Sequence, residues 1–225
     1  HFTGYVWYRQ GWSHPALATS FGRRLFWVTE PMARLASVTT GGISLETLLV
    51  QRHGVLDHLL ETAILDGRVG QVVEVAAGLS PRGYRFAERH AHRGLQYFEA
   101  DLPDMAATKR RRLERGGLTR TNHHVVDIDA LADLGPTSLD DAIGPRLDPQ
   151  RGVAIITEGL LNYFDEAAVR GMWTRFVRLA HRCAGGLYLA DLHLSGETLH
   201  MPAVRTFKRM LDAFARGSTH MQFQT

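Results

Sequence analysis

Apolar positions divide this chain of 225 residues into two parts with different patterns. Residues 1–68 are helical or irregular in pattern, and the stretch 45–65 keeps most of its leucines on one helical face. After residue 68, short β-branched or aromatic runs alternate with helical stretches. This alternation is typical of a doubly wound, mostly parallel α/β sheet with helices on both faces. We therefore expect an aromatic-rich helical cap over 1–68 and an α/β domain over 69–225.

Five short runs are candidates for the strands of the sheet. In the first run, 71–76, the stretch Val72-Val73-Glu74-Val75-Ala76 is nearly all apolar, as expected for a strand that is covered on both faces. One helix is expected to begin at Ser80-Pro81, with serine as N-cap and proline in its first position. Further helices are expected after Pro103, over 166–183 and over 202–216. The other candidate strands are 95–100, 123–128, 153–157 and 186–191.

Composition narrows the class of protein. Hydrophobic residues make up 44% of the chain and charged residues 22%, which is ordinary for a globular protein. No apolar stretch approaches the ~18–20 residues that a membrane span requires, and the first residues do not have the pattern of a signal peptide. Cys183 is the only cysteine, which excludes an intrachain disulfide and a zinc site built from cysteines. We expect a cytoplasmic protein with no metal and no membrane partner.

One basic run is a candidate for binding nucleic acid. The run Lys109-Arg110-Arg111-Arg112 is compact, but the net charge of the whole chain is only +3. A charge of this size gives a weak electrostatic footprint. We therefore predict that the run is a solvated helix face ending near Gly116, and that the protein has no nucleic-acid partner.

The turn after the first strand bears on the choice of cofactor. Ala76, Gly78 and Pro81 stand at the positions of the three glycines of a dinucleotide fingerprint. Proline has no N–H to offer a pyrophosphate, so the pattern disfavours NAD and suits a cofactor without phosphate. Asp101 lies 23 residues after Gly78, at the end of the second strand. There it could accept both hydroxyls of an adenosine ribose, or cap the next helix.

Acidic residues also follow the third and fourth strands, at the edge of a parallel sheet where ligands bind. Asp127 could accept a hydrogen bond from an adenine amino group, with Ile128 against the ring, or simply end the strand in solvent. Glu158 follows a buried strand and could meet an ammonium group of the cofactor. The pair His123-His124 is not expected to share a metal, because adjacent residues of a strand point to opposite faces.

Five segments, taken in order, resemble the leucine carboxyl methyltransferase family, which includes the tetracenomycin-type polyketide O-methyltransferases. The resemblance covers roughly residues 45–191, and its specificity lies in the order and spacing of the segments. The segments are Arg-(x)4-Asp at 52–57, Val-Ala-Ala-Gly-Leu at 75–79 followed by Arg82, Phe-Glu-Ala-Asp-Leu-Pro at 98–103 followed by Lys109, Asp-Ile at 127–128, and Glu-Gly-Leu-Leu-Asn-Tyr at 158–163.

This resemblance implies a class I (Rossmann-like) methyltransferase fold with S-adenosylmethionine as cofactor. The chain departs from the family at Ala76, where the family has glycine, and at Ser80-Pro81, where it has Asp-Thr. We also expect the two antiparallel strands that follow the fifth strand in the family to be missing here. By resemblance, Arg52 holds the cofactor carboxylate, Ala76 and Gly78 form the turn around its methionine part, Asp101 binds the ribose, Asp127 and Ile128 bind the adenine, and Glu158 binds the methionine end.

The expected reaction is transfer of the sulfonium methyl group to a carboxyl or hydroxyl oxygen of a small molecule such as a polyketide-like metabolite. A carboxylate needs no base, whereas a phenol, with a pKa of about 10, benefits from one. His193 is a candidate base or a surface residue, and Asp191 could orient it or end the strand. Tyr163 could line the acceptor pocket or pack under the sheet edge. The aromatic N-terminal segment could be a lid, a packed cap or a dimer contact.

Three alternatives to this function remain open. The acceptor could be the C-terminal carboxyl group of a protein. The chain could be a dinucleotide-dependent oxidoreductase, which Pro81 and the missing glycines disfavour. It could also be a non-catalytic Rossmann-like binding module.

Overall fold

The computed structural model of the chain describes residues 2–39 and 45–191. A five-stranded parallel sheet runs through its centre in the order β3-β2-β1-β4-β5. The chain therefore leaves β1 toward β2 on one side and returns to β4 on the other, which makes the carboxyl ends of β1 and β4 the switch point where such sheets bind ligands. The strands are β1 (Gln71–Val75), β2 (Gln96–Asp101), β3 (His123–Asp127), β4 (Val153–Thr157) and β5 (Gly186–Ala190).

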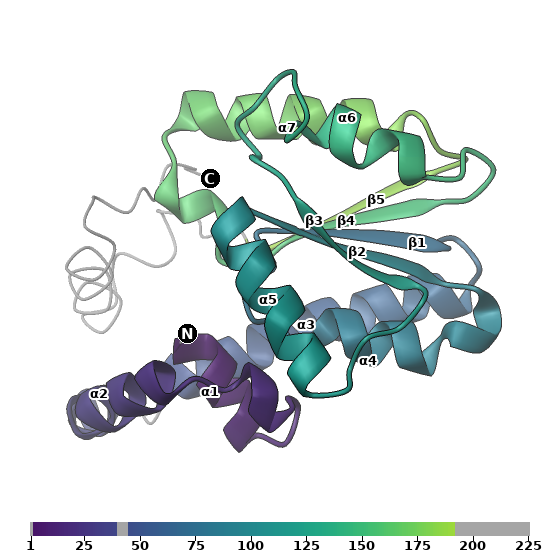
Figure 1. Ribbon diagram of the computed structural model, residues 1–225. Coiled ribbons are helices and arrows are strands. Elements are labelled where there is room, and N and C mark those ends of the chain that lie inside the picture. Colours follow the sequence, from purple (N-terminus) through teal and green to yellow (C-terminus); the bar gives the residue numbers. More distant parts are fainter. Residues whose placement is uncertain (1, 40–44, 192–225) are drawn as a thin grey trace.

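Helices cover both faces of the sheet, as the alternating pattern predicts (Figure 1). On one face lie α6 (Leu139–Ala142) and α7 (Glu166–Ala180); on the other lie α3 (Leu45–Leu65) and α4 (Arg82–Arg89), with α5 (Pro103–Arg115) beside β2 and β3. The first helices are α1 (Phe2–Arg9) and α2 (Ser20–Thr39). Short 3-10 turns cover Pro15–Leu17, Ala91–Arg93, Gly144–Arg146 and Leu161–Tyr163.

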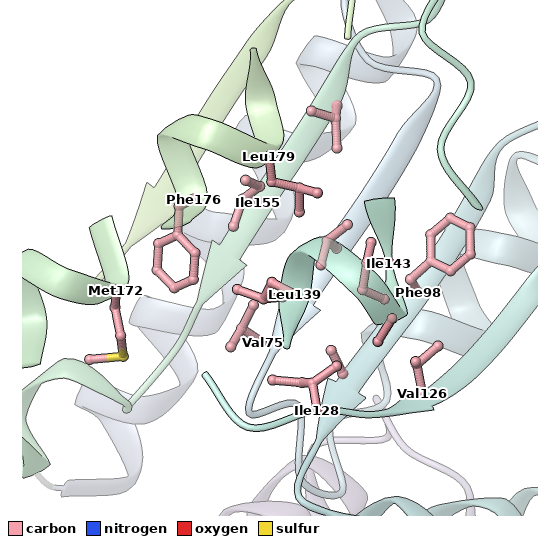
Figure 2. Close-up of a cluster of buried hydrophobic side chains, with 14 of the residues drawn as sticks. Val75, Phe98, Val126, Ile128, Leu139, Ile143, Ile155, Met172, Phe176 and Leu179 are labelled. Carbon is pink, nitrogen blue, oxygen red and sulfur yellow. The ribbon is translucent and has the colours of Figure 1, made fainter. Parts of the chain in front are cut away.

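Each face of the sheet has its own hydrophobic core. Figure 2 shows the core under α6 and α7, where Phe98, Ile155 and Phe176 pack together with the other residues labelled there. The core on the opposite face joins Leu60 of α3 and Phe86 of α4 to Tyr97 of β2. Because β1 and β4 contribute side chains to both cores, they are buried along their whole length.

The predicted doubly wound parallel fold is confirmed, and the expected strands agree with the observed ones to within a residue at each end. The helix expected from Ser80-Pro81 begins at Arg82 instead, with Pro81 at the N-cap; the Ser80 hydroxyl still accepts a hydrogen bond from the Arg82 N–H at 3.2 Å. Helix α7 ends at Ala180, earlier than expected, because the chain then turns so that the Cys183 N–H bonds to the Ala180 carbonyl.

The N-terminal helices form a separate small core with the start of α3. Tyr5 and Val6 of α1 pack with Phe26 of α2 and Leu49 of α3. Within the described ranges, no helix combines the length and the apolar character that a bilayer span demands. The helix expected over 202–216 lies outside the described residues.

Candidate functional site

The turn after β1 is bonded directly to the end of β2. The Gly78 N–H donates to Oδ2 of Asp101 at 2.6 Å, and the Leu102 N–H donates to Oδ1 at 2.8 Å. Burial raises the pKa of the Asp101 carboxyl, although both N–H donors oppose the rise. Two predicted cofactor residues, Gly78 and Asp101, therefore lie together at the carboxyl edge of the sheet.

The same turn has an unusual backbone. Gly78 has φ +51°, and Ala76 has φ +56°, a left-handed conformation that glycine adopts without cost and alanine does not. Ala76 is the position where the chain departs from the glycine of the resembling family. Its conformation shows why glycine suits this position.

Arg52 and Glu158 form an ion pair at the end of β4. The Arg52 Nε donates to Oε1 of Glu158 at 3.1 Å, and its Nη1 lies 2.8 Å from Oδ2 of Asp191. The Gly159 N–H donates to the other Asp191 oxygen at 2.8 Å, so Asp191 fixes both the arginine and the turn after β4. Arg52 retains some solvent exposure, with 23% of its side chain accessible. The pair thus presents one cation and one anion beside the switch point.

Arg82, in the first turn of α4, is the hub of this cluster and is fully buried. Its Nε contacts Asp57 at 2.5 Å, its Nη1 contacts Glu74 at 2.6 Å, and its Nη2 contacts Glu158 at 2.6 Å. Burial works against the charged guanidinium, but Glu74 and Glu158 hold the pKa of Arg82 well above its ordinary value. Arg82 therefore stays charged and joins α3, α4, β1 and the end of β4.

His53 lies against the buried side of Glu158. Its Nδ1 is 2.8 Å from Oε2 of Glu158, and the imidazole ring packs against Trp7 and Trp12 of the N-terminal segment. Although burial disfavours its ionisation, the hydrogen bond to His53 and the charges of Arg82 and Arg52 hold the pKa of Glu158 well below its ordinary value. Glu158 is therefore an ionised carboxylate in the folded protein.

The residues predicted to bind adenine lie at the end of β3. Asp127 is half-exposed and pairs with Arg110 at 2.8 Å, beside a surface hollow of about 460 Å³ that both residues line. Ile128 is buried in the core under α6 and α7, and its N–H donates to the Asp101 carbonyl at 2.8 Å. The backbone of β3 is therefore tied to the predicted ribose residue, while the Ile128 side chain serves the core.

The two predicted catalytic residues fare differently. Tyr163 follows β4 by a short turn, and 47% of it is exposed. His193 lies outside the described residues.

The basic run at 109–112 is only in part the solvated face that the sequence predicts: Arg111 is exposed and the helix ends before Gly116, but Lys109 does not face solvent. Lys109 is buried; its Nζ donates to the Ser80 carbonyl at 2.6 Å and to Glu99 at 3.0 Å. Arg112 turns back to the Ala16 carbonyl at 2.8 Å. The prediction failed for Lys109 because the charge pattern alone does not show that Glu99, inside β2, requires a buried cation.

Comparison with known proteins identifies the family of this chain. Residues 27–176 match the profile of the leucine carboxyl methyltransferase family. The chain belongs to this family. The resemblance of the sequence segments to leucine carboxyl methyltransferases is thereby confirmed.

Named relatives agree with the assignment to the leucine carboxyl methyltransferase family. A protein of Mycobacterium leprae, named as an S-adenosyl-L-methionine-dependent methyltransferase, is 37% identical over 126 residues, which are 56% of this chain and 38% of that protein. A protein of Mycobacterium tuberculosis H37Rv with the same descriptive name is 37% identical over 123 residues, or 54% of this chain and 37% of that protein. The matched region thus spans less than two fifths of either relative.

The fold itself also has a solved counterpart. The crystal structure of a DUF574 family protein from Streptomyces avermitilis superposes with a TM-score of 0.59 at 13% sequence identity. The superposition covers 99% of this chain and 78% of that protein. At this identity the likeness concerns the fold alone.

Sequence reasoning missed two members of the cluster. Arg82 entered only as part of a motif, and His53 had no role. Glu74 was the available signal, because an acidic residue inside an otherwise apolar strand needs a buried cationic partner, and Arg82 is that partner. Nothing in the sequence distinguishes His53 from the other histidines.

Proposed function

We propose that this protein is an S-adenosylmethionine-dependent methyltransferase that methylates a carboxyl or hydroxyl oxygen of a small molecule. The observation that carries the proposal is the Arg52–Glu158 pair beside the switch point of the sheet. Asp101 lies at the end of β2, the strand next to β1. Membership of the leucine carboxyl methyltransferase family supports it.

The side chains at this edge suit the cofactor chemically. Its amino-acid end carries a carboxylate and an ammonium group, which match the opposite charges of Arg52 and Glu158. Its ribose offers two hydroxyls to a carboxylate, and Asp101 lies where β2 ends. The cofactor has no phosphate, and Pro81 at the start of α4 offers no N–H to one.

The bound cofactor supplies a methyl group on a positively charged sulfur, which is a strong electrophile. The contribution of this chain is to hold the amino-acid end through Arg52 and Glu158 and the ribose through Asp101, so that the acceptor oxygen meets the methyl group in line. A carboxylate acceptor is already nucleophilic at neutral pH, so Arg52, Glu158 and Asp101 need move no proton for it.

The aromatic N-terminal segment is the proposed cover of the site. Trp7 and Trp12 pack on His53, which contacts Glu158, and a methyl group on Gly4 would lie 3.4 Å from Leu79 in the turn after β1. We propose that these contacts exclude water and give the acceptor an apolar boundary, which suits a polyketide-like metabolite.

Calorimetry tests the cofactor assignment. The chain is expected to bind S-adenosylhomocysteine, the demethylated cofactor, and not to bind NAD. Arg52→Ala removes the carboxylate partner and is expected to lower affinity about tenfold or more, since a hydrogen bond to a charged group contributes about 1.5–3 kcal/mol. Arg170→Ala is the matched control, because Arg170 pairs with Glu166 on the exposed face of α7. Binding of NAD alone, or equal affinity in both variants, contradicts the proposal.

Transfer of a labelled methyl group tests the acceptor. The chain is incubated with an extract of its source cells and methyl-labelled cofactor, and the products are separated by mass. Label in the low-mass fraction supports a small-molecule acceptor, whereas label in polypeptides supports a protein carboxyl group. Mild alkali releases methanol from a methyl ester but not from a methyl ether, which distinguishes carboxyl from hydroxyl acceptors. Absence of transfer in every fraction favours a binding module.

A further inference from the structure

Arg82 is buried more deeply than the other arginines of the charged cluster, Arg52 and Arg85. Its side chain has no accessible surface, while Arg52 retains 23% and Asp57 16%. A buried guanidinium is costly unless every N–H group that leaves water finds a partner. The contacts of Arg82 therefore indicate a role beyond packing.

The three nitrogens of Arg82 contact three carboxylates from different elements, and Nη2 also lies 2.8 Å from Nδ1 of His53. Nε and Nη1 are held by Asp57 of α3 and Glu74 of β1, and Glu74 is fixed in turn by the Tyr97 hydroxyl at 2.8 Å. Two sides of the guanidinium are thus anchored in the folded core. Only Nη2 reaches the end of β4, where it donates to Oε2 of Glu158 at 2.6 Å.

This anchoring determines how Glu158 lies. Because Oε2 is occupied by Arg82 and His53, Oε1 is the oxygen that meets Nε of Arg52. Arg52 is fixed on its other side by Asp191. A chain of contacts therefore runs from the core through Arg82 to Glu158 and then to Arg52.

We propose that Arg82 is a positioning residue for the amino-acid end of the cofactor. It fixes Glu158, and through Glu158 it fixes Arg52, without touching the cofactor itself. The inference rests on the proposed function, which assigns these two side chains to the ammonium and carboxylate groups. A purely structural Arg82 would instead support all parts of the site equally.

Two probes distinguish positioning from general support. S-adenosylhomocysteine carries the ammonium and carboxylate groups, and 5′-methylthioadenosine lacks both while keeping the nucleoside. Arg82→Lys keeps the positive charge but replaces the planar guanidinium by a single ammonium group. This group cannot reach all three carboxylates in the geometry that the guanidinium uses. The variant is expected to bind S-adenosylhomocysteine about tenfold or more weakly, as the loss of one charge-assisted hydrogen bond predicts, and to bind 5′-methylthioadenosine as the wild type does.

Two further variants complete the experiment. Arg85→Lys is the matched control: Arg85 lies on the same helix and pairs with Asp57, but no contact joins it to Glu158 in the described structure, so both affinities are expected to remain unchanged. If Arg82→Lys does not fold, Asp57→Asn replaces it, because this change loosens the Arg82 Nε anchor and is expected to weaken the first probe alone.

The outcomes separate this inference from the proposed function. Equal losses for both probes, or no loss for either, overturn the positioning role and leave the cofactor assignment standing. A wild-type chain that binds neither probe overturns the proposed function and the positioning role together.

Discussion

The left-handed backbone at Ala76 gives a prediction with a definite sign. For an L-residue other than glycine this conformation costs about 1–2 kcal/mol. Glycine removes that cost but loses about 0.5–1 kcal/mol through its greater freedom in the unfolded chain. Ala76→Gly is therefore expected to raise the free energy of unfolding by about 0.5–1 kcal/mol. Most single substitutions destabilise a protein, so a gain of this size is diagnostic.

Urea unfolding measures the effect, and the neighbouring alanine supplies the control. With a slope of about 2–3 kcal/mol per molar urea, the expected gain moves the midpoint upward by about 0.2–0.5 M. Ala77 is buried and its φ is not positive, so Ala77→Gly loses a packed methyl group and gains only flexibility. The free energy of unfolding of Ala77→Gly is therefore expected to fall by about 1 kcal/mol or more. A midpoint for Ala76→Gly that falls as far as that of Ala77→Gly would refute the reasoning.

Two other predictions concern the buried charges. Lys109→Met is expected to destabilise the fold by about 3–5 kcal/mol in urea unfolding, because Glu99 is left buried without its lysine partner. Adding Glu99→Gln to this variant is expected to recover part of the lost stability. A Lys109→Met variant as stable as the wild type contradicts this prediction. Since the pKa of Glu158 is lowered on folding, its ionisation contributes stability above the ordinary glutamate pKa of about 4.3, and this stability is lost as the pH falls below that value. Urea unfolding between about pH 6 and pH 3 is therefore expected to be less pH-dependent in Glu158→Gln than in the wild type, and equal slopes would contradict the assignment.

The strands could be predicted because their burial leaves a direct trace in the sequence. In β1 and β4 both faces are covered, so most residues are apolar, and each run ends just before the turn that contains Gly78 or Glu158. The alternation of strands and helices predicts a parallel sheet, whereas the strand order is known only from the structure. The start of α4 and the end of α7 also shifted, because local hydrogen bonds at the first and last turns decide where a helix begins and ends.

The charged cluster could be predicted only in part. Arg52 was identified through a family motif and Glu158 also through its place after a buried strand, and the structure pairs them. The mistake over Lys109 and the omission of Arg82 have one physical cause. Which charged side chains are buried depends on contacts between segments far apart in the chain, and local periodicity reports only the face of a helix.

The cluster around Arg82 also has a consequence for when its charged side chains come together during synthesis. Arg82 and Glu158 are 76 residues apart in the chain, and Arg52 and Glu158 are 106 apart. During synthesis, no ligand can find the complete pair before β4 has left the ribosome and joined β1. Contacts of such long range form slowly because large loops must close first. Since any ligand of the pair binds only the assembled sheet, it stabilises the whole fold by mass action, and its presence in the cell favours maturation of newly made chains.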